Sequence, residues 1–124
     1  MEKSKKVLVI DDDPETVNFI KNVLSQAGYE VYAAFRGQEG MELLKKVRPE
    51  LILLDLVLPE QSGFQVGQKI KSISRYKDIP IIAISLKKDD IDKHIAAKSG
   101  FLAYLEKPLD SATLLFQVAD IFKK

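Results

Sequence analysis

The stretch LILLD, residues 51–55, places a carboxylate directly after a run of apolar residues. Pro59 and Gly63 follow shortly afterwards and indicate a loop. We therefore expect Asp55 to lie where a buried strand meets a loop. An ionised carboxylate is costly to remove from water, so a charge in that place is expected to be paired, bound to a metal ion or used in chemistry.

Further apolar runs along the chain resemble this one. They are Val7–Ile10, Val31–Ala34, Ile81–Ile84 and Leu102–Leu105. Short apolar runs of this kind are typical of parallel strands that are buried on both faces. Polar groups follow several of them: Asp11, Asp12 and Asp13 come after the first run, Ser85 after Ile84, and Lys107 shortly after Leu105.

Segments with helical spacing separate these runs. The first helix is expected to begin at an N-cap on Asp13, with Pro14 in its first turn, and to stop before Gly28. The remaining helices are expected at about Gln38 to Val47, Phe64 to Ile73, Asp89 to Lys98, and from a cap on Asp110 to the end of the chain.

Alternating strands and helices predict an α/β fold, a doubly wound, five-stranded parallel sheet with five helices on its two faces. Right-handed crossovers place the carboxyl ends of all such strands at one edge, where ligands bind. The polar groups that follow the strands are therefore expected to converge there: Asp11, Asp12, Asp55, Ser85 and Lys107.

The bulk properties limit the class of protein. A chain of 124 residues with 46% hydrophobic content is expected to form one domain, residues 1–124. Its formal net charge of +1 favours neither nucleic acid nor an anionic membrane as a partner. The absence of cysteine excludes disulfides and thiolate metal sites. No apolar stretch is long enough for a membrane span, so a soluble, cytoplasmic protein is expected.

Taken together, these motifs resemble the receiver domain of bacterial response regulators, and the chain is similar to the stand-alone chemotaxis type over essentially its full length. The resemblance rests on VLVIDDDP at residues 7–14, on the spacing of Asp55, Pro59 and Gly63, on the hydroxyl that ends IIAIS at residues 81–85, and on Lys107-Pro108 three residues after Tyr104. It implies a flavodoxin-like sheet with strand order 2-1-3-4-5.

The resemblance also implies roles for individual residues. Asp55 would be the phosphoacceptor, taking a phosphoryl group from a histidine of a sensor kinase or phosphotransfer protein. Mg²⁺ prefers oxygen ligands and would screen the charges that meet in this step. Asp12, Asp55 and the backbone carbonyl of Val57 would bind the ion, and Asp11 would act through water or by holding Lys107. Lys107 and the Ser85 hydroxyl would contact phosphoryl oxygens.

The output implied by the resemblance is a conformational change. Ser85 would move toward the phosphoryl group, Tyr104 would turn inward, and the face made by the fourth helix, fifth strand and fifth helix would change. A downstream protein would read this face, with no direct nucleic-acid or membrane contact, and the chain would be a monomer or a phosphorylation-dependent dimer. Phe101, Leu102 and Phe116 are candidates for the partner face, and the bulk of Leu86 is expected to narrow access to Asp55.

Several alternatives stay open at the level of sequence. The three consecutive aspartates also fit a solvated helix cap, Tyr104 also fits an ordinary strand residue, and His94 on a polar helix fits a solvated face better than catalysis. The chain is expected not to be an enzyme, beyond assisting its own phosphorylation and dephosphorylation. The competing functions are a receiver-like interaction module that needs no phosphate and, less favoured, an aspartyl-phosphate phosphatase, which would want an Asp where Val57 stands.

Overall fold

The computed structural model of the protein describes residues 4–86 and 90–123. Its strands form one parallel sheet in the order β2-β1-β3-β4-β5. This is the predicted direction and order. The strands are β1 (Lys6–Ile10), β2 (Glu30–Ala34), β3 (Leu51–Asp55), β4 (Ile81–Ser85) and β5 (Ala103–Glu106).

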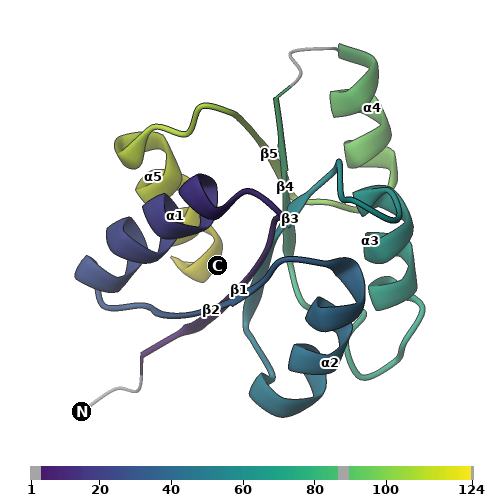
Figure 1. Ribbon diagram of the computed structural model, residues 1–124, viewed down its shortest axis with the longest axis horizontal. Coiled ribbons are helices and arrows are strands. Elements are labelled where there is room, and N and C mark those ends of the chain that lie inside the picture. The colour runs from purple at the N-terminus through teal and green to yellow at the C-terminus, as the bar shows by residue number, and fades with distance from the viewer. Residues whose placement is uncertain (1–3, 87–89, 124) are drawn as a thin grey trace.

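Helices cover both faces of this sheet (Figure 1). One face carries α1 (Pro14–Gln26) and α5 (Ser111–Lys123), and the other carries α2 (Gly37–Val47), α3 (Gly63–Lys71) and α4 (Asp90–Lys98). The predicted doubly wound α/β fold is therefore confirmed, and each crossover from one strand to the next passes through a helix.

Two hydrophobic cores lie on the two faces of the sheet. Val7 and Val9 of β1 pack with α1 and α5, whereas Leu8 and Ile10 pack with α2, α3 and α4. Because successive side chains of a strand point to opposite faces, a strand covered on both sides must be apolar at every position. This explains why the runs in the sequence are continuous and do not alternate with polar residues.

The first helix begins and ends as the sequence predicts. The side chain of Asp13 accepts hydrogen bonds from the backbone N–H of Glu15 (3.2 Å) and the hydroxyl of Thr16 (2.8 Å). Pro14 is the first helical residue, where its missing N–H costs no hydrogen bond. After the helix Gly28 adopts a φ of 96°, which favours glycine.

Other boundaries differ slightly from the prediction. α3 begins at Gly63, one residue earlier than expected, because Ser62 caps it: the Ser62 hydroxyl oxygen accepts from the N–H of Gln65 (3.2 Å), and the Gln65 side chain accepts from the N–H of Ser62 (3.3 Å). β5 begins at Ala103, one residue later than expected. The predicted start of the fourth helix at Asp89 lies outside the described residues.

Phe101 is buried, contrary to its predicted place on a partner face. Its side chain is 6% exposed and its ring stacks on Phe64 with a centroid separation of 6.1 Å. The ring occupies space that a side chain on α3 would otherwise fill, because a Cβ atom at Gly67 would lie only 2.3 Å from it. The absence of a side chain at Gly67 therefore admits Phe101 into the core.

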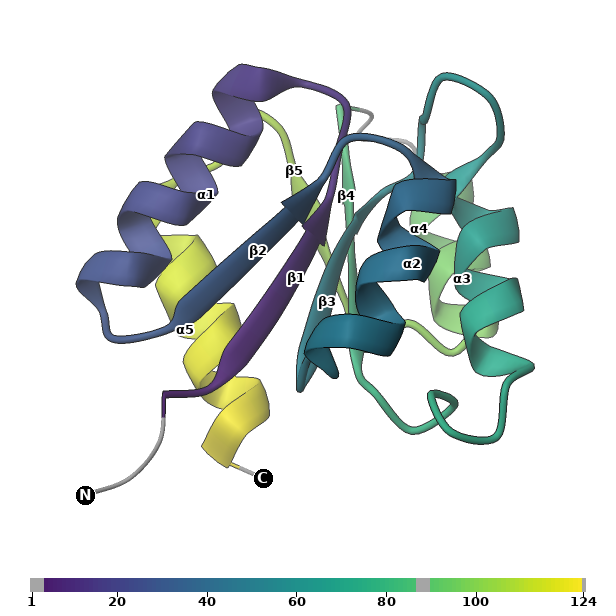
Figure 2. The ribbon, with the colours of Figure 1, turned by 60° about the horizontal axis from the view of Figure 1, so that its bottom comes forward.

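The parallel arrangement gathers the carboxyl ends of the strands at one edge of the sheet (Figure 2). The loops that leave this edge carry the polar residues singled out from the sequence. Among the residues that the structure describes, no helix is both long and apolar enough to cross a membrane.

Candidate functional site: an acidic pocket at the carboxyl edge

Asp55 is the last residue of β3 and is only 4% exposed. Its Oδ1 atom accepts a hydrogen bond from the backbone N–H of Val57 (2.9 Å), and its Oδ2 atom accepts one from Nζ of Lys107 (3.2 Å). Asp55 is buried because β3 lies at the centre of the sheet, and its carboxylate is paired, as expected from the sequence.

The loop after Asp55 closes tightly over the strand end. Gly63 donates its N–H to the carbonyl of Leu56 (2.8 Å), and a Cβ atom at Gly63 would lie 2.1 Å from the carbonyl oxygen of Asp55. Only glycine fits this approach of backbone to backbone. The Pro59 and Gly63 signals thus mark the loop that fixes the position of Asp55.

Asp11 and Asp12 follow β1, the neighbour of β3. Asp11 is fully buried and accepts a hydrogen bond from the N–H of Asp13 (2.9 Å), whereas Asp12 is exposed. Each of Asp11, Asp12 and Asp55 offers a carboxylate oxygen, and these three atoms lie within 4.8 Å of one another. The predicted convergence of these carboxylates is confirmed.

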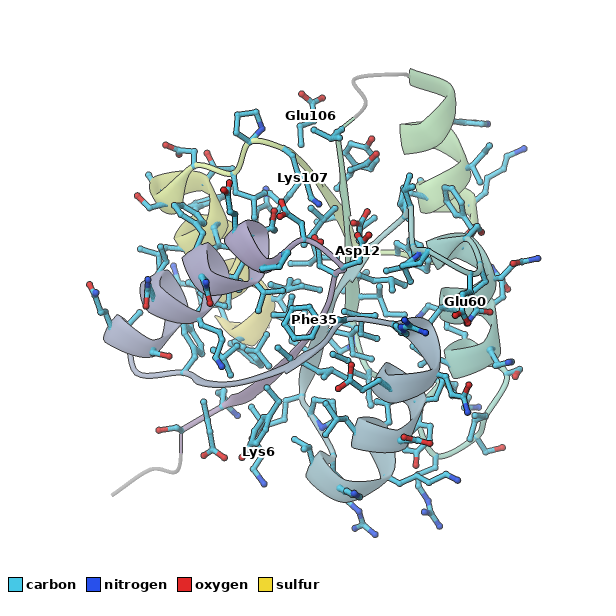
Figure 3. The ribbon with its side chains drawn as sticks, viewed as in Figure 1. Lys6, Asp12, Phe35, Glu60, Glu106 and Lys107 are labelled. Atoms are coloured by element: carbon cyan, nitrogen blue, oxygen red, sulfur yellow. The ribbon has the colours of Figure 1, made fainter. Side chains whose placement is uncertain are left out.

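Lys107 reaches the same place from the end of β5. Its Nζ atom lies 2.9 Å from Oδ2 of Asp11 and 3.2 Å from Oδ2 of Asp55, so one ammonium group bridges two buried carboxylates. Its backbone N–H donates to the carbonyl of Ser85 (2.8 Å), which fixes the strand end that carries it. In Figure 3 Lys107 and Asp12 lie together at this edge.

The charges perturb one another. Burial raises the pKa of the Asp55 carboxyl to about 6, and Asp11 adds to the rise, while the N–H of Val57 and the ammonium of Lys107 oppose it. Burial alone would lower the pKa of Lys107, but the hydrogen bond to Asp11 and the charges of Asp11 and Asp55 outweigh it, so that pKa is raised. Asp55 is therefore a basic carboxylate held beside a firmly charged ammonium.

The donor set suits a hard divalent cation. Three carboxylates against one lysine leave an excess of negative charge, and among the described residues Lys107 is the one cation that pairs with the buried Asp11. Carboxylate and carbonyl oxygens are the ligands that Mg²⁺ and Ca²⁺ take. The residues present therefore fit a magnesium-type ion, and the exposed position of Asp12 leaves its carboxylate accessible to water.

The structure also places the other predicted residues. Ser85 is buried (2% exposed) at the end of β4, next to β3, and Tyr104 is half-buried in β5 against the core on the α2, α3 and α4 face. His94 is exposed on α4. Leu86 is 73% exposed and lines a hollow of about 330 Å³ together with Lys107, so its effect on access to Asp55 stays a prediction.

Of the predicted partner face, two members are exposed: Leu102 (64%) and Phe116 (67%). Phe101 is not available, because it is packed between α3 and the sheet. The sequence pattern showed an aromatic residue in a loop but not the gap at Gly67 that receives it.

Two features of the loops around the site were not predicted from the sequence. An ion pair between Arg36 and Glu60 (2.8 Å) links the loop after β2 to the loop after β3. No local pattern announces a pair so far apart in the sequence. The Ser62–Gln65 capping box, in contrast, is a recognisable spacing and could have been found.

A buried aspartate at the end of a central parallel strand, flanked by two carboxylates and a lysine, defines a receiver-type acidic pocket on a doubly wound sheet. Residues 7–119 match the response regulator receiver domain family, and the chain belongs to that family. It carries the receiver fold of two-component response regulators, the class of phosphoacceptor signalling switches.

Individual proteins and solved structures are also similar to this chain. The chain is 35% identical over 119 residues to RpaA of Synechocystis, a DNA-binding dual master transcriptional regulator, covering 96% of this chain and 49% of RpaA. The chain thus spans about half the length of that relative. The Vibrio cholerae chemotaxis protein CheY4 superposes with a TM-score of 0.90 at 29% identity, covering 95% of this chain and 98% of CheY4. The phosphorylated cyanobacterial phytochrome response regulator RcpA superposes with a TM-score of 0.80 at 28% identity, covering 95% and 91%.

Proposed function

We propose that the protein is a phosphorylation switch in which Asp55 accepts a phosphoryl group from a histidine of a sensor kinase or phosphotransfer protein. The observation that carries this proposal is the bridging of Asp55 and Asp11 by Lys107 within an acidic pocket at the strand edge. A related receiver, RcpA, is described as phosphorylated, which supports the same chemistry here.

The transfer balances as a displacement at phosphorus. A carboxylate oxygen of Asp55 forms a bond to phosphorus, the bond from phosphorus to the donor's histidine nitrogen breaks, and that nitrogen keeps the electron pair and takes up a proton. The raised pKa of Asp55 makes its ionised oxygen a better nucleophile than an ordinary carboxylate, while at neutral pH most of the group is still ionised.

Mg²⁺ would be held by Asp12, Asp55 and the carbonyl of Val57, with Asp11 acting through water, and when bound it neutralises charge between the carboxylate and the phosphoryl group. The chain's own residues do the rest. Lys107 lies 3.2 Å from Oδ2 of Asp55, within reach of an oxygen of a phosphoryl group attached there. The Val57 N–H holds the carboxylate in a fixed orientation, so that positioning supplies much of the catalysis.

The response to phosphorylation would pass through Ser85 and Tyr104. A hydrogen bond from the Ser85 hydroxyl to the phosphoryl group would draw β4's end inward, and Tyr104, half-buried on the neighbouring strand, would follow. Moving such an equilibrium from 1:99 to 99:1 takes about 5.5 kcal/mol. A few charge-assisted hydrogen bonds at about 1.5 to 3 kcal/mol each are sufficient. The downstream protein would then read the α4–β5–α5 face, where Leu102 and Phe116 are exposed.

The test is intact-mass spectrometry after incubation with acetyl phosphate and MgCl₂. We expect the wild type to gain one phosphoryl group and Asp55→Asn to gain none. EDTA should abolish the gain, and Asp12→Asn should slow it at least tenfold because a metal ligand is lost. Asp78→Asn is the matched control, since Asp78 is exposed and outside the pocket, and it should react like the wild type.

Other outcomes separate the competing functions. If the wild type gains no mass while an established receiver reacts under the same conditions, the protein is a phosphate-independent interaction module. Sustained turnover of a generic phosphate ester that is lost in Asp55→Asn would instead identify a phosphatase. Size-exclusion chromatography of the phosphorylated and free forms measures whether phosphorylation produces a dimer.

A further inference from the structure

The opposite edge of the sheet, where the strands begin, is built differently from the phosphorylation site. In Figure 3 Lys6 lies at this edge, away from Asp12 and Lys107. Two adjacent hollows open there. One of about 630 Å³ is lined by residues that include Lys5, Lys6, Lys46 and Arg48, and one of about 310 Å³ is lined by Arg48, Pro49, Arg75, Tyr76 and Ile79. Arg48 lines both hollows, and Glu50 is the one acidic residue among those that line them. We call the surface around the two hollows the basic edge.

Only some of these positive charges are explained by their position at the carboxyl end of a helix. The helices run antiparallel to the strands, so their negative carboxyl ends gather at this edge, and lysines in their last turns, such as Lys45 and Lys46 in α2, complement them. Arg75 lies beyond the end of α3, in the connection to β4. Its charge is not required by the last turn of a helix.

The cations of the basic edge differ in how they are used. Lys5 pairs with Glu50 (3.3 Å), and Lys6 donates to the carbonyl of Val47 (3.4 Å). Lys46, Arg48 and Arg75 are exposed, and none of the three has an ion-pair partner among residues 4–86 and 90–123. The guanidinium groups of Arg48 and Arg75, which both line the smaller hollow, therefore have no ion-pair partner in that part of the chain.

The backbone of Arg48 supplies an independent observation. Arg48 is the C-cap of α2 and has φ 55° and ψ 65°, the left-handed conformation that glycine adopts without strain. Among the described residues it is the one non-glycine residue with a positive φ. Glycine would end the helix here with less backbone strain, so the exposed arginine side chain is not required to make this turn.

We propose that the basic edge binds an acidic segment of a partner protein. Guanidinium groups match carboxylates with paired hydrogen bonds, and the other residues that line the smaller hollow are Pro49, Tyr76 and Ile79. At about 310 Å³ the hollow has room for one large apolar side chain flanked by carboxylates. Nucleic acid fits less well, because the chain as a whole carries a formal net charge of only +1.

This binding would be independent of the switch. Asp55 is the last residue of β3, whereas Arg48 and Pro49 come just before its first residue, Leu51. An acidic segment held at the basic edge therefore leaves the phosphorylation site open. The basic edge would serve as a constant tether, and the α4–β5–α5 face as the conditional contact. The tether does not rest on the proposed function, and its affinity is expected to be the same for wild type and Asp55→Asn.

The test uses fluorescence anisotropy with a fluorescein-labelled peptide that carries one phenylalanine between two runs of glutamate. We expect binding that weakens with added salt and is lost when glutamine replaces glutamate in the peptide. Arg48→Gly and Arg75→Gln should each weaken binding roughly tenfold, as expected for loss of a charge-assisted hydrogen bond. Lys21→Gln, which removes an exposed charge from α1, should bind within about twofold of the wild type.

Arg48→Gly also separates binding from folding. Because glycine relieves the left-handed backbone, the melting temperature of this variant should stay the same or rise while binding falls. A lower melting temperature would show that Arg48 supports the fold and would overturn the argument from strain. Unchanged binding in both arginine variants would overturn the site, as would tighter binding of duplex DNA or phosphatidylserine vesicles than of the acidic peptide.

Discussion

Replacing Asp55 by asparagine should make the metal-free protein more stable above neutral pH, although it destroys the phosphoacceptor. The pKa of Asp55 is raised from 3.8 to about 6, chiefly by burial. Because the folded-state pKa lies above the unfolded one, the ionised carboxylate opposes folding. The wild type therefore loses stability as pH rises from about 4 to about 6 and does not regain it at higher pH. Asparagine has the same shape and carries no charge.

The magnitude follows from the same rise in pKa. At about 1.4 kcal/mol per pH unit, the change from 3.8 to about 6 corresponds to about 3 kcal/mol. Asparagine keeps an oxygen that can accept from the N–H of Val57, and Lys107 keeps its contact with Asp11. We expect the free energy of unfolding of Asp55→Asn to exceed that of the wild type by about 2 to 3 kcal/mol at pH 8 and by less than about 1 kcal/mol at pH 4.

Urea unfolding in EDTA at the two pH values measures the difference. Asp78→Asn, at an exposed position, should change stability by less than about 0.5 kcal/mol at either pH. MgCl₂ should then narrow the gap at pH 8, because an ion that binds only the folded wild type stabilises it. A variant less stable than the wild type at pH 8, or an advantage that does not depend on pH, would refute the account of Asp55 as a destabilising buried charge.

Two further predictions concern packing and helix capping. Phe101→Ala should destabilise the protein by about 3 kcal/mol and Gly67→Leu by about 2 kcal/mol. The double variant should lose less stability than the sum of the two, since the leucine fills the space that the ring leaves. Additive losses of stability in urea unfolding would show that the two positions do not share one cavity. Ser62→Ala should lower the free energy of unfolding by about 1 kcal/mol, because it removes the side-chain cap of α3. Ser74→Ala, at an exposed position, is the control. Equal losses of stability in the two variants would argue against the cap.

The positions of the helices and strands along the chain depend largely on local features of the sequence. Residues 51–54 are all apolar because β3 lies between two other strands and has helices packed on each face of the sheet. Asp13, Pro14 and Gly28 mark the ends of α1 through hydrogen bonds and backbone angles that involve only near neighbours. Patterns of this kind predict the elements to within a residue or two. The rule that parallel strands end at one edge predicts that Asp11, Asp12, Asp55 and Lys107 meet there.

What depends on contacts between distant residues was decided by the tertiary structure alone. Phe101 reads as a candidate surface aromatic until the missing side chain of Gly67 is seen beside it. The bridging position of Lys107, and with it the raised pKa of Asp55, depends on burial that a linear pattern does not measure. The groups that meet at the strand edge can be identified from the sequence, because each apolar run and the polar residue that follows it are neighbours in the chain. Only the packed structure decided how buried and how paired each one is, because desolvation and charge coupling are properties of neighbours in space.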